Sequence, residues 1–186
     1  QQAYPAHLME IIVIDDHSTD ATIDEVQKIG SERIAFYNLK DYPEYIKAPA
    51  YKKSAITLAV DKATSEYIVI TDADCVHPSQ WLNDVVFGLE KNQSAFQTAP
   101  VIIDGGPTLL AKMQETEQLV LMLITAAGIK SGLHDIANGA NMAFRKSAFL
   151  IVDGYAGNEQ FASGDDMFLA EKMRKAFPGQ IAFNKS

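Results

Sequence analysis

The sequence predicts a layered α/β fold with a mostly parallel sheet flanked by helices. Short runs rich in Ile and Val alternate with longer segments that have the composition of helices. Runs of this length are typical of strands buried on both faces of a parallel sheet, and helices that alternate with such strands cover the sheet. The 186 residues suit one domain, and no linker or internal repeat divides them. We therefore expect residues 1–186 to form a single domain.

The first predicted unit is a strand followed by a helix and a second strand. The first strand covers 10–16 and ends in carboxylates, and the helix covers 18–30. Ser18 or Thr19 is expected to cap the helix, and Gly30 to end it. Together with the strand that follows, this unit should cross over right-handedly.

The remaining elements continue the alternation. Strands are expected at 33–39, 66–75, 95–103, the start of 138–149, and 180–184. Helices are expected at 52–64, 79–92, 107–130, the end of 138–149, and 163–177. Prolines and the lack of a period mark 41–51 as a loop. In such folds ligands bind beyond the carboxyl ends of the strands, so acidic residues that follow a strand are candidates for a site.

The composition excludes some classes of function. The chain has 24 acidic and 16 basic residues, a net charge of −8, and no basic stripe, so it is not expected to bind nucleic acid. Cys75 is the single cysteine, which excludes an internal disulfide and a cysteine-based zinc site. A lone cysteine fits a reducing compartment, and the expected location is the cytoplasm.

The longest apolar run covers 119–129. It is too short to span a bilayer, which needs about 20 residues. We expect it to form a buried or interfacial helix. The cytoplasmic face of a membrane is an alternative location if the chain is part of a longer protein.

The segment TDADC follows an apolar run directly and contains Asp72 and Asp74. An Asp-x-Asp turn at the end of a strand can direct two hard oxygen ligands at one point, and Mg²⁺ and Mn²⁺ prefer such ligands. A polar turn is the alternative, because Asp is common in turns. The position after a buried strand favours a metal site.

The segment VIDDHSTD places Asp15 and Asp16 at the end of the first strand. We expect these two acids to contact a base or a ribose, whereas residues 18–20 are expected to start the next helix. Lys52 and Lys53 open the helix at 52–64 and could contact phosphates, although solvated lysines are the more common case.

The segment SGDDMFL contains Asp165 and Asp166, where a loop leads into a helix. These acids could simply favour the positive end of the helix, or one of them could act as a general base. Asn138 and Gly139 indicate a tight polar segment near the site. Trp81 is expected to lie in the core rather than to stack on a sugar.

The order of VIDDHSTD, KKSAITLAV, TDADC, NGANMAFRKSAF and GDDMFL resembles the family 2 glycosyltransferases of the GT-A fold. The resemblance extends over roughly residues 8 to 184. Each motif alone is weakly specific, but five motifs in the order of the family are a strong indication.

The resemblance implies a role for several of these residues. Asp15 or Asp16 matches the acid that contacts the nucleoside, usually uridine. Lys52 or Lys53 matches a basic residue near the nucleotide, and of the two we expect Lys53 to contact the nucleotide sugar. Asn138 and Gly139, together with Asp72, are also expected to contact it.

The resemblance also implies a metal and a base. Asp74 is expected to hold Mn²⁺ or Mg²⁺ directly, with Asp72 beside it. Asp165 and Asp166 match a Glu-Asp pair of the family, and its second member, here Asp166, is expected to be the base. Asp165 departs from the family's Glu and reaches less far.

The expected function is inverting transfer of a sugar from a nucleotide-diphosphate donor, a UDP-sugar, to a hydroxyl of a carbohydrate or lipid-linked acceptor. Such a reaction belongs to polysaccharide or glycolipid biosynthesis. The chain contains neither the family's first strand nor its Gln-x-x-Arg-Trp motif, so we expect a fragment truncated at both ends, which could be inactive. A non-catalytic nucleotide-sugar-binding domain is one alternative, and a sugar nucleotidyltransferase is a second.

Overall fold

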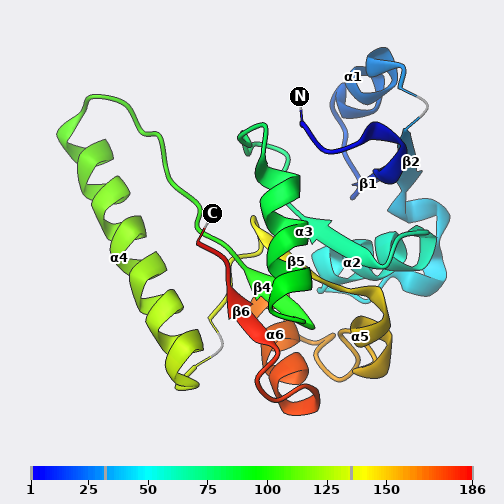
Figure 1. The fold of residues 1–186 in the computed structure, drawn as a ribbon. Helices are drawn as coiled ribbons and strands as arrows, with labels where there is room; N and C mark the ends of the chain where they lie inside the picture. Colours follow the sequence, from blue (N-terminus) through cyan, green and yellow to red (C-terminus); the bar gives the residue numbers. More distant parts are fainter. Residues whose placement is uncertain (1, 32, 135, 186) are drawn as a thin grey trace.

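The computed structural model describes residues 2–31, 33–134 and 136–185. It confirms the α/β class (Figure 1). The strands are β1 (Ile11–Asp15), β2 (Ile34–Asn38), β3 (Tyr67–Ile70), β4 (Phe96–Thr98), β5 (Met142–Arg145) and β6 (Ile181–Phe183). The helices are α1 (Thr22–Ile29), α2 (Tyr51–Lys62), α3 (Trp81–Lys91), α4 (Leu109–Ser131), α5 (Lys146–Ile151) and α6 (Asp165–Ala176). Short 3-10 helices are η1 (Ala6–Leu8), η2 (Leu39–Asp41) and η3 (Pro43–Tyr45).

The strands form two sheets. Strands β1 and β2 pair in parallel, and the second sheet has the order β3-β5-β4-β6. Strand β5 runs antiparallel to β3 and β4, and β6 runs parallel to β4. In the second sheet β3, β4 and β6 therefore share one direction, and β5 alone runs against them.

The reversed direction of β5 decides which segments meet at the edge of the sheet. Met142, the first residue of β5, pairs with Ile70 at the end of β3 and with Thr98 at the end of β4. The segment before β5 therefore lies beside the residues that follow β3. This register brings NGAN (138–141) next to TDADC (71–75).

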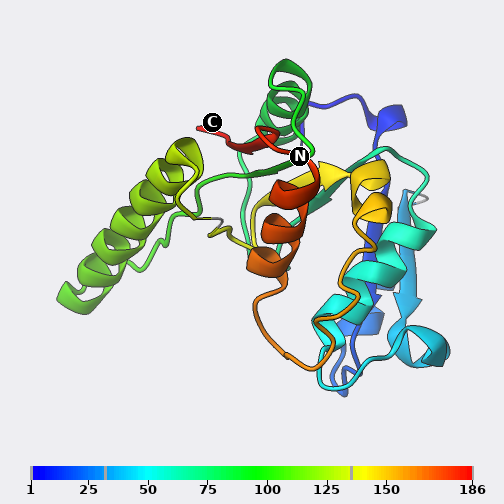
Figure 2. The same cartoon turned by 90° about the horizontal axis from the view of Figure 1, so that it is seen from below.

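Helices cover both faces of the second sheet. Alternate residues of each strand point to opposite faces, so one strand contributes to the cores on both sides. Met142 and Phe144 of β5 belong to the main core, which also contains Leu169 of α6 and Ile56 of α2. Ala143, between them, packs against α3 in a smaller cluster. Figure 2 shows α3 on one side of this sheet and α6 on the other.

Helix α2 links the two sheets. Ile56 and Val60 are buried in the main core, and the helix also packs against β1. Among the described residues β1 and β3 each pair with one strand, so each has an open edge. The two strands, together with α2 and α3, line a groove of about 490 Å³. Lys52 and Asp72 belong to the lining of this groove, which therefore reaches the acidic turn after β3.

Helix α4 was expected to be buried or interfacial, and the structure shows that it is not buried. In both views it lies at the side of the second sheet, where it contacts β6 (Figures 1 and 2). Its covered face consists of Ala111, Met122, Thr125 and Gly128, whereas apolar residues such as Leu123 are largely exposed. None of the described helices is long and apolar enough to cross a membrane.

Some predicted boundaries were wrong for local reasons. Helix α1 is not capped by Ser18 or Thr19; instead the side chain of Asp20 accepts the N–H of Thr22. Gly30 does end this helix, in the left-handed conformation that glycine adopts without strain. The strand predicted at 95–103 ends at residue 98, shortly before a proline that has no N–H for a ladder.

Candidate functional site

The acidic turn after β3 is held in place by polar contacts within the turn and to His77, which follows it. The backbone N–H of Cys75 donates to the carbonyl of Asp72 at 3.2 Å. The hydroxyl of Thr71 lies 2.7 Å from Nε2 of His77. The carboxylates of Asp72 and Asp74 remain exposed. The turn thus presents both acids to solvent from a fixed backbone.

A stacked pair of rings joins this turn to the segment before β5. His77 lies on Trp81, with ring centroids 3.7 Å apart, and burial lowers the pKa of His77. The indole N–H of Trp81 donates to Oδ1 of Asn141 at 3.1 Å. Trp81 was expected to be a core residue; it is half-buried and also links the two loops of the site.

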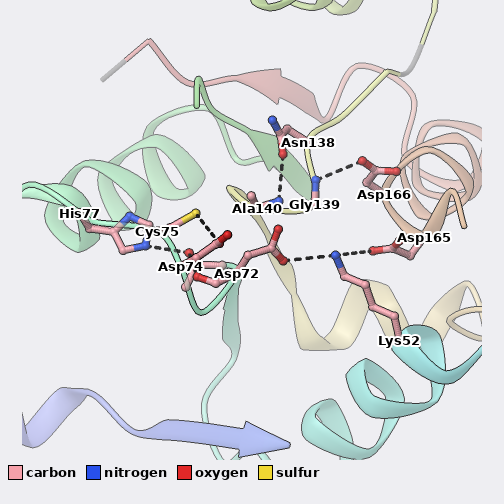
Figure 3. A network of polar contacts seen from close by, with 11 residues as sticks. Lys52, Asp72, Asp74, Cys75, His77, Asn138, Gly139, Ala140, Asp165 and Asp166 are labelled. Carbon is pink, nitrogen blue, oxygen red and sulfur yellow. Dashed lines mark hydrogen bonds and ion pairs between the residues drawn. The ribbon is translucent and has the colours of Figure 1, made fainter. Parts of the chain in front are cut away.

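The segment before β5 is a tight turn with a defined backbone. The backbone N–H of Asn138 donates to the hydroxyl of Thr98 at 3.1 Å, and its Oδ1 accepts the N–H of Ala140 at 2.9 Å. The N–H of Gly139 then points to α6, where it donates to Oδ2 of Asp166 at 3.1 Å (Figure 3). The predicted polar segment therefore contacts the predicted base directly.

Lys52 lies between Asp72 of the turn after β3 and Asp165, the first residue of α6 (Figure 3). Its Nζ is 3.3 Å from Oδ1 of Asp72 and 3.7 Å from Oδ2 of Asp165. Burial acts to lower the pKa of Lys52, but Asp165 and Asp72 raise it, and the net pKa lies above its ordinary value. The ammonium is therefore firmly charged at neutral pH.

Asp165 is buried, and its Oδ2 has no hydrogen-bond partner among the described residues. Lys52 lies beyond hydrogen-bond distance of this oxygen, so their interaction is one of charge alone. A buried carboxylate without a hydrogen bond is unfavourable unless a charge or a ligand compensates for it. Asp165 thus retains an unused acceptor that faces the cluster.

Gly139 leaves open the space that these charged groups share. A Cβ at this position would lie 3.3 Å from Nζ of Lys52, 3.4 Å from Oδ2 of Asp165 and 3.8 Å from Oδ2 of Asp166. A side chain here would occupy the centre of the cluster. The glycine is therefore explained by the approach of three charged groups.

Asp166 is half-buried at the start of α6. Burial raises its pKa and Asp165 adds to this effect, whereas the N–H groups of Met167 and Gly139 act in the opposite direction, and the net pKa is raised. A raised pKa makes Asp166 a stronger proton acceptor than an ordinary aspartate.

Asp15 and Asp16 lie at the end of β1 and differ in their surroundings. Asp15 is buried, and its Oδ2 accepts the side-chain N–H of Asn38 at 3.1 Å and the backbone N–H of Ser18 at 3.3 Å. Its Oδ1 has no hydrogen-bond partner in the described part of the chain. Asp16 is exposed and lies 2.7 Å from Nδ1 of His17. The contacts found for these acids do not connect them to Lys52.

Lys53 does not lie in the acidic cluster. It is 2% exposed, and its ammonium donates to the backbone carbonyls of Asn158, Phe161 and Ser163. Lys52 is the lysine that lies beside the acids. Consecutive residues on a helix point about 100° apart, so the sequence could narrow the choice to this pair of lysines but not decide between them.

The two acids of the turn could supply only part of the ligands that a divalent cation needs. In the described ranges no group of three or more His, Cys, Asp or Glu side chains is arranged to hold a metal ion. Asp72 and Asp74 are nevertheless hard oxygen ligands. Mg²⁺ commonly takes one or two protein carboxylates and completes its shell with water and substrate phosphates. The two acids could therefore supply part of the shell of such a cation, and the other ligands would have to come from outside the described residues.

The clustered acids and the lysine lie at the carboxyl edge of the sheet, which is where α/β folds bind their ligands. The chain belongs to glycosyl transferase family 2, since the model of that family matches residues 1–150. This confirms the family that the motifs resemble. No curated protein matches the sequence.

Solved structures of S. aureus TarS have a similar fold. The crystal structure of its residues 1–349 is 17% identical with a TM-score of 0.67, and the match covers 98% of this chain and 50% of that one. The same TarS fragment in complex with UDP-GlcNAc is 17% identical with a TM-score of 0.63, covering 98% and 48%. The longer TarS structure is 16% identical with a TM-score of 0.67, covering 100% and 31%. The chain thus spans half or less of the length of these structures.

Proposed function

We propose that this chain binds a nucleotide sugar and catalyses inverting transfer of the sugar to an acceptor hydroxyl. The observation that carries the proposal is the cluster of Lys52, Asp72, Asp165 and Asp166 around Gly139, which draws on α2, the turn after β3, the segment before β5 and α6. Membership of glycosyl transferase family 2 supports the same reaction class.

The proposed donor is a UDP-sugar. Crystal structures of TarS, which shares the fold, contain UDP-GlcNAc and UDP. Asp15 is the proposed contact of the base, because its Oδ1 still lacks a donor among the described residues. Asp16, exposed beside it, is the proposed contact of the ribose. The proposed acceptor is a carbohydrate or a lipid-linked hydroxyl, as in polysaccharide or glycolipid synthesis, at the cytoplasmic side.

Lys52 is the proposed contact of the diphosphate. Its charged ammonium lies at the end of the groove beside Asp72. There it can release the carboxylate of Asp72 and bind a phosphate oxygen instead. Asp74 and Asp72 would hold Mg²⁺ or Mn²⁺, which when bound neutralises charge on the leaving diphosphate. Asp165 keeps Lys52 charged and near this position.

Asp166 is the proposed base. As the acceptor oxygen forms its bond to the anomeric carbon, the bond from that carbon to the phosphate oxygen breaks, and the diphosphate leaves with the electron pair. The proton of the acceptor hydroxyl passes to the carboxylate of Asp166, and the anomeric configuration inverts. General-base catalysis is typically worth about 10²–10⁴-fold in rate, and the raised pKa of Asp166 favours this role.

The first test is binding. Thermal unfolding is measured with UDP-GlcNAc, with and without Mn²⁺. A ligand at a hundredfold excess over its dissociation constant stabilises a protein by about 2.7 kcal/mol. We expect UDP-GlcNAc to raise Tm, and to raise it further when Mn²⁺ is present. This further rise should be lost in Asp74→Asn but kept in Asp24→Asn, a matched change on the exposed face of α1. The absence of a metal-dependent shift with a panel of nucleotide sugars would count against the proposal.

The second test is turnover, measured as UDP release. Asp166→Asn is expected to bind UDP-GlcNAc as the wild type does and to release UDP about 10²–10⁴-fold more slowly. Binding by the wild type without release or transfer, with acceptors of both classes present, would indicate a non-catalytic nucleotide-sugar-binding domain. Unchanged turnover in Asp166→Asn would remove this residue from the mechanism.

A further inference from the structure

The loop that leads into the proposed base has no helix or strand of its own. It extends from the end of α5 at Ile151 to the start of α6 at Asp165. Gly154, Gly157 and Gly164 in this loop have positive φ. Backbone carbonyls in such a segment need partners, because no ladder or helix supplies them.

Two lysines supply many of these partners. Lys172 of α6 donates to the carbonyls of Asp153, Gly154 and Ala156 at 3.3, 2.7 and 3.1 Å. Lys53 of α2 donates to the carbonyls of Asn158, Phe161 and Ser163 at 3.1, 2.8 and 3.2 Å. An ammonium group has three donors, so each lysine uses all of them on one half of the loop.

The surroundings of Lys53 show that its ammonium is part of a built site. The side chain is 2% exposed, and the ammonium lies 4.7 Å from the ring centre of Phe168, which stacks on Phe161 of the loop. Burial lowers the pKa of Lys53, whereas Asp165 and Glu159 act to raise it. A charge buried this far would be unfavourable without its three carbonyl acceptors.

Lys53 and Lys52 are consecutive residues, and they contact the two ends of the short segment 163–165. Lys53 holds the carbonyl of Ser163 at 3.2 Å, and Lys52 faces the carboxylate of Asp165 at 3.7 Å. The first turn of α2 therefore contacts both the backbone that enters α6 and the first acid of α6. Asp166 follows immediately.

We propose that Lys53 is a positioning residue for the base: its ammonium fixes residues 158–163 and thereby sets where Asp166 stands relative to Lys52 and Gly139. This inference rests on the proposed function. It replaces the expectation that Lys53 contacts the nucleotide sugar. Lys172 holds only the first half of the loop, at 153–156, and therefore provides a matched control.

The test compares Lys53→Met with Lys172→Met, which both keep the apolar stem and remove the donors. Amide hydrogen exchange is expected to accelerate over 158–166 in Lys53→Met and over 153–157 in Lys172→Met. UDP release is expected to slow by roughly 10–100-fold in Lys53→Met, because a displacement of about 1 Å can change a rate by 10². UDP-GlcNAc binding should be unchanged, and Lys172→Met should stay within about threefold of the wild type.

Two results would overturn the inference. One is unchanged exchange over 158–166 in Lys53→Met, and the other is an equal loss of turnover in both variants. If Lys53→Met fails to fold, Lys53→Arg replaces it. A planar guanidinium does not reproduce three converging ammonium bonds, so exchange over 158–166 should rise partway. Exchange in Lys53→Arg equal to that of the wild type would contradict the role.

Failure of the proposed function is distinguishable from failure of this inference. The titration of the Asp166 carboxyl, followed by NMR, needs no turnover. It should move in Lys53→Met and stay unchanged in Lys172→Met. A wild-type chain that neither binds nor transfers a sugar would reject the proposed function, while exchange and titration would still decide the role of Lys53.

Discussion

Replacing Lys52 by methionine is expected to destabilise the chain mainly through Asp165 rather than through Asp72. The ion pair with Asp72 joins side chains that are 45% and 46% exposed, and exposed pairs contribute about 0.2–1 kcal/mol. The side chain of Asp165 is only 10% exposed, and its Oδ2 has no hydrogen-bond partner among the described residues. Lys52 is therefore the group that compensates for the burial of Asp165.

The expected magnitude lies between those of surface and buried pairs. Removing one partner of a buried pair costs about 3–5 kcal/mol. Lys52 is nearly half exposed and 3.7 Å away from Asp165, so we expect about 1–2 kcal/mol for this pair. For chains of this size each kcal/mol shifts Tm by about 2–4 °C, so Lys52→Met should lower Tm by roughly 2–8 °C.

A double-mutant cycle separates the two acids. Unfolding in urea is measured for Lys52→Met, Asp165→Asn, Asp72→Asn and the two pairs that include Lys52→Met. The coupling free energy with Asp165 should exceed about 1 kcal/mol, and that with Asp72 should stay below it. Equal coupling to both acids, or none to Asp165, would refute the argument that burial of Asp165 decides the effect.

The dependence on pH provides a second check of the same pair. The folded state raises the pKa of Lys52, chiefly through Asp165 and Asp72 against the opposing effect of burial. Its stabilising contribution is therefore fully present below the ordinary lysine pKa of about 10.4 and is lost as pH rises through the raised value. The difference between wild type and Lys52→Met should be constant around neutral pH and shrink only in strongly alkaline solution.

Three further predictions concern the same cluster. Asp165→Asn removes a charge that adds to the effect of burial in raising the pKa of Asp166, so the acidic limb of kcat/KM should move to lower pH; an unmoved limb would contradict this. Gly139→Ala places a methyl group 3.3 Å from Lys52 and 3.4 Å from Asp165; kcat/KM should fall about tenfold, while Tm changes by less than about 2 °C. The hydroxyl of Tyr155 is buried without a hydrogen-bond partner in the described chain, so Tyr155→Phe should be neutral or stabilise by up to about 1 kcal/mol in urea unfolding.

The positions of the strands could be predicted because their apolar runs are distinct. The runs at 10–16 and 33–39 became β1 and β2, and the run at 66–75 became β3 together with the acidic turn. Periodicity does not carry the direction of a strand, so nothing in the sequence pattern indicated that β5 runs against its neighbours. Of the two expected environments of α4, buried or interfacial, the structure contradicts only burial: an apolar run predicts a need for burial, but not whether a partner covers it.

The acids of the site could be predicted from their positions in the sequence. Their contacts with Gly139 and Lys52, on which the proposed chemistry depends, could not. Asp72 follows a buried strand and Asp166 begins a helix, and both positions are visible in the sequence. That both lie near the ammonium of Lys52 depends on β5, whose reversed direction brings Gly139 to the edge where β3 ends. The N–H of Gly139 then reaches Asp166, and the space beside its Cα admits the ammonium of Lys52. A parallel β5 would place this segment at the opposite edge of the sheet, and the same acids would remain two unrelated polar turns.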